Sequence, residues 1–407
     1  MTTLLTRKPL WAALTEKDIR AGQESLSMPL LSVSKKLGIV RYSDLFPDRV
    51  VRADDHSHYK VVEPREIVLN KMSAATGAVG YARERGMISP DYAVFETSSD
   101  CDFRFITYVL ASDWFCKNEV QPRLQGIGVG DSANVRTPRV GIDSYLSARV
   151  FLPPLDTQRT IADYLDFETG EIDAMITKMD QLAETLLLRR SAVIEKNTTS
   201  RSGSFTRMKF CGDVSLGKTV QGEQKHKDEL FVNYVRAASI QLYGLELDDQ
   251  RMWMTQAELK KYDLLKDDVL IVEGGAGYGR SVVLSEGMPE WGFQNHVIRV
   301  RPNRRCEGRF LDYCVKGHYS GGLISLLADG ATIPGLSSEK VRDLPVPVCS
   351  LEEQRGIVEH LDKVTGRIGA MLAKVASLKG LLIERRAALI TDVVTGRKEV
   401  ARWGTRN

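Results

Sequence analysis

The amino-acid sequence predicts an α+β protein in which two mixed α/β, β-rich domains are separated by two long antiparallel coiled-coil helices. Three observations predict this fold. A long segment of the chain occurs twice, each copy carries a heptad pattern of apolar residues, and short β-type runs fill the stretch before each copy. The chain is therefore predicted to be a tandem duplication with pseudo-two-fold symmetry.

The composition is that of an ordinary globular protein with more than one domain. The chain has 407 residues, of which 43% are hydrophobic and 27% charged, and domains average about 150 residues. The six cysteines are scattered and form no C-x-x-C motif, which favours reduced thiols in a cytosolic protein. No apolar run reaches the roughly 20 residues of a membrane helix, and no signal peptide is evident. We therefore expect a cytoplasmic protein without a membrane segment.

The repeat begins where Gln158 and Arg159 recur as Gln354 and Arg355, an offset of 196 residues. At the same offset, without a gap, identities continue for more than 30 residues, through to Ile194 and its counterpart Ile390. Such a register does not arise by chance. The two globular blocks therefore each precede a copy of the same long segment.

That segment is predicted to be a helix of about 38 residues, roughly 57 Å long at a rise of about 1.5 Å per residue. Apolar residues recur every seven positions, which is typical of a coiled-coil seam. The second heptad column lies three residues later and includes Met175, Leu182, Met371 and Leu378. The seam residues are Leu165, Ile172, Met179 and Leu186 in the first copy and Leu361, Ile368, Val375 and Leu382 in the second.

Signals at the helix ends place the domain boundaries. A capping box at Ser350–Glu353 starts the second helix, and Asp156 supplies an acidic first turn in the first. We expect globular domains at residues 1–152 and 201–347. The helices follow at 153–200 and 348–400, with a C-terminal tail at 401–407.

Short runs of β-branched residues, separated by glycine and proline, predict the strands of the two globular blocks. One clearer helix is predicted near the end of each block, at residues 103–115 and 309–327. The blocks share a strand–loop–strand plan, with residues 66–81 matching 268–283 loosely. The predicted strands are 60–62, 67–69, 269–272, 282–284 and 297–300.

Two glycine-rich motifs suggest nucleotide chemistry, but their surroundings do not fit it. Residues 212–219 (GDVSLGKT) match a phosphate loop, yet the residues that follow do not predict the helix whose N-terminus binds phosphate. Residues 273–279 (EGGAGYG) match the cofactor loop of adenosylmethionine-dependent methyltransferases, but β-type residues follow. The catalytic N/D-P-P-Y/F motif of DNA base methyltransferases is absent.

The sequence offers no other catalytic or metal constellation. Asp54, Asp55, His56 and His58 lie close together, but no further ligand stands at a telling distance, which favours a solvated loop. We predict a non-catalytic chain that binds no metal and no cofactor of its own.

The duplicated segments resemble those of the specificity subunit of type I restriction-modification enzymes. The resemblance rests on the P-L-x-x-Q-R-x-I opening and the L-L-x-x-R-R-x-A-x-I close of the first copy, on its second copy, and on residues 61–95 and 268–302. It implies two target recognition domains, each binding half of a bipartite double-stranded DNA site. It also implies two methyltransferase subunits and restriction (motor) subunits as partners, which use adenosylmethionine, ATP and Mg²⁺.

Side chains on the matching loops are the candidates for base contacts, since arginine suits guanine and asparagine or glutamine suits adenine. Two readings from other classes remain open: a methyltransferase that uses loop 273–279, and a coiled-coil adaptor with two protein-binding domains. The candidates are Asn70, Lys71, Ser73, Arg83 and Arg85 in the first block, and Glu273, Tyr278, Arg280, Gln294, Asn295 and His296 in the second.

Overall fold

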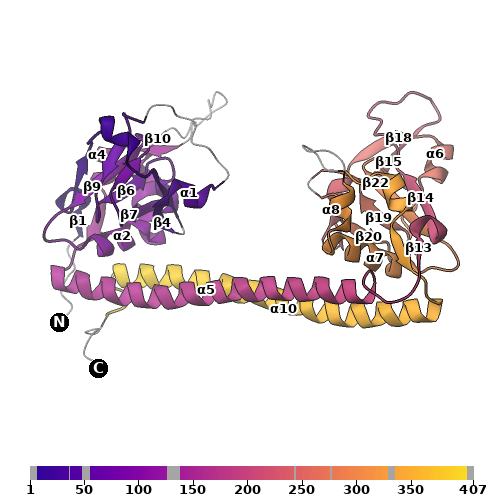
Figure 1. Cartoon of the computed structure of the whole chain (residues 1–407). Helices are drawn as coiled ribbons and strands as arrows, with labels where there is room; N and C mark the ends of the chain where they lie inside the picture. Colours follow the sequence, from indigo (N-terminus) through magenta and orange to yellow (C-terminus); the bar gives the residue numbers. More distant parts are fainter. Residues whose placement is uncertain are drawn as a thin grey trace. The chain divides into compact units, whose positions relative to one another are not determined.

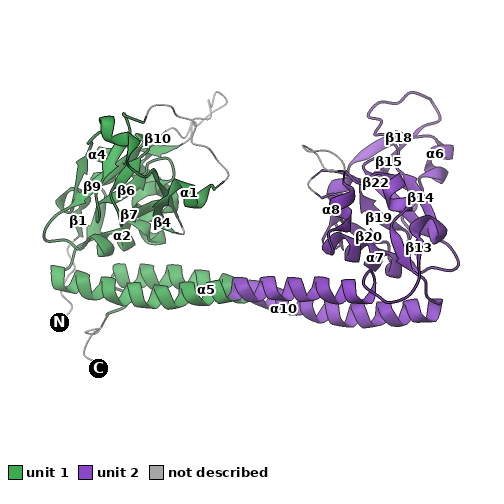
Figure 2. Cartoon of the chain, in the orientation of Figure 1, with its two compact units in different colours: residues 1–178, 377–407 green, residues 179–376 purple. Residues whose placement is uncertain are grey.

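The structure is a computed structural model that describes residues 7–35, 37–47, 56–125, 138–242, 244–275, 277–328 and 335–400. The chain divides into two compact units, one of residues 1–178 with 377–407 and one of residues 179–376 (Figure 2). Each unit contains one β-rich head and parts of both long helices (Figure 1). The predicted fold class is confirmed.

The head of the first unit is built on a four-stranded sheet of order β2-β9-β6-β7, in which all neighbours are antiparallel. Two-stranded pairs β1-β12, β3-β4, β5-β8 and β10-β11 surround it. The strands are β1 Arg7–Pro9, β2 Leu14–Lys17, β3 Leu31–Ser34, β4 Gly38–Arg41, β5 Lys60–Val62, β6 Ile67–Asn70, β7 Val79–Tyr81, β8 Gly86–Ile88, β9 Tyr92–Thr97, β10 Leu124–Gln125, β11 Arg139–Val140 and β12 Arg149–Phe151. The helices are α1 Tyr42–Leu45, α2 Phe103–Ala111, α3 Asp113–Phe115 and α4 Ile142–Leu146.

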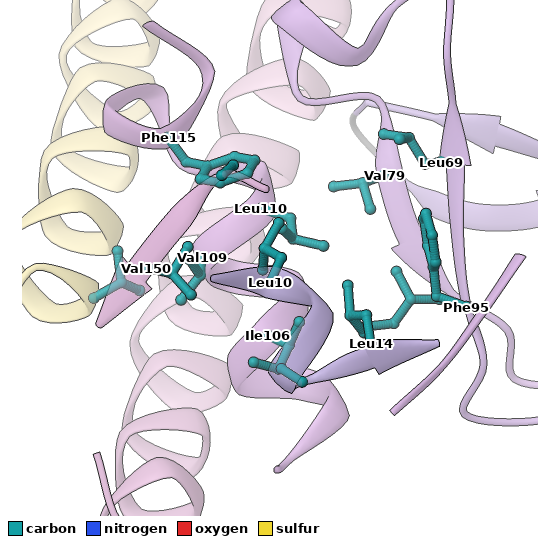
Figure 3. Close-up of a cluster of buried hydrophobic side chains, with 14 of the residues drawn as sticks. Leu10, Leu14, Leu69, Val79, Phe95, Ile106, Val109, Leu110, Phe115 and Val150 are labelled. Carbon is teal, nitrogen blue, oxygen red and sulfur yellow. The ribbon is translucent and has the colours of Figure 1, made fainter. Parts of the chain in front are cut away.

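The core of this unit joins the sheet to the long helices. Side chains of β6, β7 and β9 pack against α2 and the chain around Leu10, as Figure 3 shows for Leu69, Phe95 and Ile106. Leu165 and Ile390, from the two long helices, belong to the same buried cluster. The head and its helix segments therefore share one hydrophobic core.

The head of the second unit has a four-stranded sheet of order β14-β22-β19-β20 and a second sheet of order β18-β15-β21. The pairs β13-β23 and β16-β17 complete it. The strands are β13 Phe205–Arg207, β14 Gly212–Leu216, β15 Leu230–Val235, β16 Ile240–Gln241, β17 Gly244–Leu245, β18 Arg251–Met254, β19 Val269–Val272, β20 Ser281–Val283, β21 Trp291–Phe293, β22 Val297–Pro302 and β23 Pro345–Pro347. The helices are α6 Gln256–Lys261, α7 Gly308–Ser320, α8 Leu323–Leu327 and α9 Ser338–Arg342.

The two four-stranded sheets have the same connectivity. The strands of each sheet can be counted in chain order. The first strand pairs with the last, the last also pairs with the second, and the second pairs with the third. All five predicted strands are present, within two residues at each end. The two predicted helices are interrupted, the first at Ser112, which caps α3, and the second at Gly322, whose φ of 82° ends regular helix geometry. The duplication seen in the helices thus extends to the heads.

The long helices are α5 (Leu155–Asn197) and α10 (Leu351–Val394), and they pair antiparallel within each unit. In the first unit, Asp173 of α5 accepts from Arg386 of α10 (3.0 Å), while Tyr164 contacts Lys398 (2.8 Å). Residue numbers on α10 therefore fall as those on α5 rise, which makes the pair antiparallel. Among the described residues, no helix combines the length and the apolarity needed to cross a bilayer.

The seam between the helices differs from the predicted one in its second column. Leu165, Ile172, Leu186, Leu361, Ile368 and Val375 are buried, and Met179 and Leu382 are half-buried. Four residues after Leu165, Thr169 is also buried (4% exposed), and its hydroxyl lies 3.1 Å from that of Tyr108 in the head. The predicted companions are exposed: Met175 47%, Leu182 43%, Met371 52% and Leu378 52%.

A buried glutamine attaches each head to its helix. Gln158, 1% exposed, accepts from the backbone N–H of Asp102 (2.9 Å) and donates to the carbonyls of Pro153 (2.8 Å) and Asp100 (3.3 Å). These bonds link the start of α5 to the turn that starts α2. One side chain thus satisfies three backbone groups that would otherwise lose their water partners.

Gln354, 2% exposed, does the same in the second unit. It accepts from the N–H of Glu307 (2.9 Å) and donates to the carbonyls of Arg305 (3.0 Å) and Cys349 (3.1 Å). The predicted capping box is also present, since Ser350 and Glu353 exchange side-chain and backbone hydrogen bonds. The glutamine of the repeat is therefore a structural attachment point in both copies.

A tyrosine strengthens each junction. The Tyr108 hydroxyl donates to Asp166 (2.8 Å) and lies 3.1 Å from the Thr169 hydroxyl. Tyr313 makes the equivalent contacts with Asp362 (2.8 Å) and Thr365 (3.2 Å), and burial, with the Asp362 carboxylate nearby, raises the pKa of Tyr313 to about 12. The hydroxyl therefore stays protonated and keeps donating at neutral pH.

Replacing Gln158 or Gln354 with alanine should lower the free energy of unfolding by about 1–3 kcal/mol for each variant, because buried backbone groups lose their partners. The measurement is urea unfolding of the full chain, followed by circular dichroism. Arg159→Ala and Arg355→Ala are the matched controls, because each changes the neighbouring exposed residue of the same helix turn. A loss no larger than that of the controls would show that the glutamines do not hold the junctions.

Candidate nucleic-acid interface

In the second unit, several candidate residues meet at one end of the four-stranded sheet. Val272, the last residue of β19, pairs with Val297 of β22, so that Glu273 lies beside His296 and its N–H donates to the His296 carbonyl (3.0 Å). On the other side, the N–H of Val272 donates to the carbonyl of Arg280 (2.9 Å), just before β20. Glu273, Arg280 and His296 therefore come from neighbouring strands at the same edge.

Side-chain contacts already occupy some of these groups. His296, 60% exposed, contacts Glu273 through Nδ1 (3.1 Å). The Tyr278 hydroxyl lies 3.2 Å from the Ser325 hydroxyl, and Arg280 donates to Gln241 (3.3 Å). These bonds hold the loop side chains in place, while the Arg280 Nε is buried and has no hydrogen-bond partner within the described residues.

The first unit places Asn70, Lys71 and Ser73 at the equivalent edge. Asn70 ends β6, pairs with Tyr92 and donates its N–H to the carbonyl of Ala78 (3.0 Å). Its side-chain oxygen accepts from the N–H of Met72 (3.1 Å) and so shapes the turn. A short 3₁₀ turn follows Ser73. The Asn70 side chain is therefore engaged by its own loop.

The other two candidates of the first unit lie at the opposite end of the same sheet. Ile67, the first residue of β6, pairs with Tyr81, the last of β7, so that Arg83 and Arg85 follow at that end. Arg85 forms ion pairs with Glu24 and Glu63 (both 2.8 Å), while Arg83 is exposed. The structure thus separates the five candidates of the first unit into two groups.

The two edges have the same backbone and different side chains. The turn after β6 runs from Lys71 to Ala78 and the turn after β19 from Glu273 to Arg280, and each contains a glycine in the left-handed region, Gly77 (φ 76°) and Gly279 (φ 77°). An L side chain is strained there. Opposite them, the residues before β9 correspond to Gln294–His296 before β22. A shared frame therefore presents different chemistry in each head.

The phosphate-loop match has a different role in the structure. Residues 212–216 form β14, and no helix follows. The Lys218 ammonium pairs with Glu258 and its side chain is only 11% exposed. Burial alone would raise the pKa of Glu258, but hydrogen bonds from Lys218 and from the N–H of Thr255 lower it. This lysine is not available to a nucleotide phosphate.

The cofactor-loop match is likewise followed by a strand, β20, and not by the helix that a methyl-donor site requires. His56 and His58 contact the Tyr59 ring edge to face, with ring centroids 4.7 and 5.1 Å away, while Asp54 and Asp55 lie outside the described residues. Within the described ranges, no three histidine, cysteine or acidic side chains are grouped so as to hold a metal ion. The methyltransferase reading is not favoured.

Sequence reasoning missed the residues that fix these loops. Gln241 holds Arg280, and Gly217 with Lys218 contacts the turn before β22. The only signal for the latter pair was the phosphate-loop pattern, which pointed to other chemistry. Gln241 carries no pattern, since its contact joins residues 39 positions apart.

A family model and two solved structures resemble this chain. Residues 211–376 match the model of the type I restriction modification DNA specificity domain. A solved chain from work on the complex assembly and conformational transition of the type I R-M system shares 13% identity and a TM-score of 0.71, with 97% of this chain and 98% of that chain covered. The HsdS subunit from Thermoanaerobacter tengcongensis shares 13% identity and a TM-score of 0.52, with 97% of each chain covered.

No curated protein sequence matches the chain. At 13% identity, the two structural likenesses establish the fold, while the family model identifies the domain of the second head. Residues 211–376 therefore resemble a type I restriction modification DNA specificity domain, and nearly the whole chain shares its fold with the two solved structures.

Proposed function

We propose that this chain is the non-catalytic subunit of a type I restriction-modification complex that reads a bipartite double-stranded DNA target. The observation that carries the proposal is the pair of equivalent sheet edges, which share strand order and turn geometry but differ in side chains. A protein that reads two different half-sites needs such an arrangement, because base edges are distinguished by the donors and acceptors that face them.

We assign each half-site to one head. Residues 1–152 and 201–347 are the target recognition domains, and residues 153–200 and 348–400 are the spacer helices. Residues 401–407 lie outside the described part of the chain. A helix of 43 residues such as α5 is about 65 Å long, more than one turn of B-DNA at about 34–36 Å. Helices of this length support half-sites separated by unread base pairs.

The exposed apolar residues of the helices support a scaffolding role. In the first unit, Met175 of α5 and Leu378 of α10 are about half exposed, and in the second unit their repeat counterparts Met371 and Leu182 are exposed to the same degree. Exposed apolar side chains on a soluble helix pair are typical of a surface that a partner covers. Other exposed apolar residues on the helices are Phe167, Leu381 and Ile383 in the first unit and Leu187 and Leu188 in the second.

Because an exposed methionine–leucine pair occurs once in each unit, these surfaces fit two copies of one partner. We propose that the partners are two methyltransferase subunits, joined in the full complex by restriction subunits. The partners would supply the sites for adenosylmethionine, ATP and Mg²⁺, and this chain would supply target choice.

Exchanging residues 1–152 for the equivalent block of another family member should change one half of the recognised site and leave the other half unchanged. The readout is genome-wide mapping of methylated adenines in cells that carry the chimeric chain. The unexchanged chain in the same cells is the control. A change in both halves, or in the spacing alone, would contradict independent reading by the two heads.

Arg280→Ala should weaken DNA binding by about 1–3 kcal/mol and relax base choice at one position of a single half-site, because a guanidinium at this edge can contact a base with two hydrogen bonds. Binding is measured by titration of labelled duplexes at fixed salt. Lys266→Ala removes an equal charge at the opposite end of β19 and is the matched control. Equal weakening for all sequences, with a lower salt slope, would mean a phosphate contact instead.

The double variant Met175→Gln with Leu378→Gln should reduce the co-purified methyltransferase from two copies to one, because it removes the apolar contacts of one unit only. The double variant Met371→Gln with Leu182→Gln should do the same through the other unit. Native mass spectrometry of complexes purified through this chain gives the copy number, with Glu184→Gln as the exposed control. Two copies retained in both double variants would rule out this docking surface.

A further inference from the structure

The turn before β22 in the second unit has an unusually well-fixed backbone. The Gln294 N–H donates to the Val235 carbonyl (3.0 Å), the Asn295 N–H to the Lys218 carbonyl (2.9 Å), and the Val297 N–H to the Gln294 carbonyl (2.9 Å). Its carbonyls also accept bonds from residues of other segments. Strand ends from β14, β15 and β19 thus hold the turn from several sides.

Gly217 and Lys218, from the phosphate-loop match, form one of these supports. The Gly217 N–H donates to Val297 (3.1 Å) and the Lys218 N–H to Phe293 (3.0 Å). A Cβ on Gly217 would overlap the carbonyl oxygens of Phe293 and Gln294, so that only glycine allows this approach. The Lys218–Glu258 ion pair anchors the segment to α6.

The side chains of this turn divide into engaged and free groups. His296 contacts Glu273. The carboxamides of Gln294 and Asn295, both half-buried, have no hydrogen-bond partner within the described residues. Each carboxamide offers two donors and an acceptor that takes two bonds, so this edge carries unused hydrogen-bonding capacity on a rigid support.

We infer that Gln294 and Asn295, held by the Gly217–Lys218 segment, read an adenine in the half-site of the second head. A carboxamide can accept from the adenine N6 amino group and donate to N7 at once in the major groove, which no other base edge allows in the same way. The inference rests on the proposed function and specifies which base is read and which residues read it. Gly217 and Lys218 are positioning residues, because they act only through the turn.

The first head provides an internal comparison. At the equivalent turn it has Ser89, Pro90 and Asp91, and the Ser89 hydroxyl accepts from the Asp91 N–H (3.3 Å). Proline has no side-chain hydrogen-bonding group and aspartate cannot donate when ionised. Adenine reading by this turn is therefore confined to the second head.

The test uses the complex that co-purifies with the tagged full-length chain from its own host, incubated with a library of random duplexes. Gln294→Ala or Asn295→Ala should lower the preference for one adenine–thymine pair about tenfold in one half-site and leave the other half-site unchanged. Gln181→Ala, which removes an exposed carboxamide from α5, is the control. Duplexes with 7-deazaadenine at that position, which lack N7, should bind the unaltered chain about tenfold more weakly and the responsive variant no more weakly than before.

A second pair of variants distinguishes the residues that position the turn from those that contact the base. Gly217→Ala should weaken the same adenine preference without changing the other half-site, whereas Gly222→Ala, which meets open space, should have no effect. If the unaltered chain selects a two-part sequence and both carboxamide variants select the same one, the inference fails alone. Uniform weakening for all sequences would also overturn it. If the unaltered chain selects no sequence, the proposed function fails with it.

Discussion

The structure depends on a single buried glutamine side chain at the start of each long helix. Gln158 and Gln354 each satisfy three backbone groups that lie between a head and its helix, and both are almost completely buried. Tyr108 and Tyr313 add a second attachment about two to three turns further along. Two attachments at different heights oppose rotation of a head about its helix, so the sheet edge that carries the candidate residues has a fixed direction within each unit.

This arrangement separates the parts that must stay constant from those that can vary. The junction residues recur in both copies with the same partners, while the loops at the sheet edge differ at nearly every side chain. A new side chain at the edge does not disturb the core, because the edge loops are held mainly by backbone hydrogen bonds. One scaffold can therefore carry different side chains at this edge.

The sequence predicted the fold class, five of the strands and the antiparallel helices, because repeats and periodicity can be read from the order of residues alone. It placed Met175 in the seam, but this residue is exposed while its apolar neighbour Ile176 is half-buried, and hydrophobicity alone does not distinguish the two. The ion pairs of Arg85 join residues up to 61 positions apart, which no pattern reveals. The phosphate-loop match failed for a related reason, since Glu258 is far from Lys218 in the sequence.

We propose that two heads on one scaffold each read half of a divided DNA site. Sequencing the duplexes that the unaltered complex selects from a random library tests it most directly. We expect two short conserved blocks separated by a fixed number of unread base pairs, because each head would read its own half-site. A single uninterrupted block, or equal binding of all sequences, would contradict it.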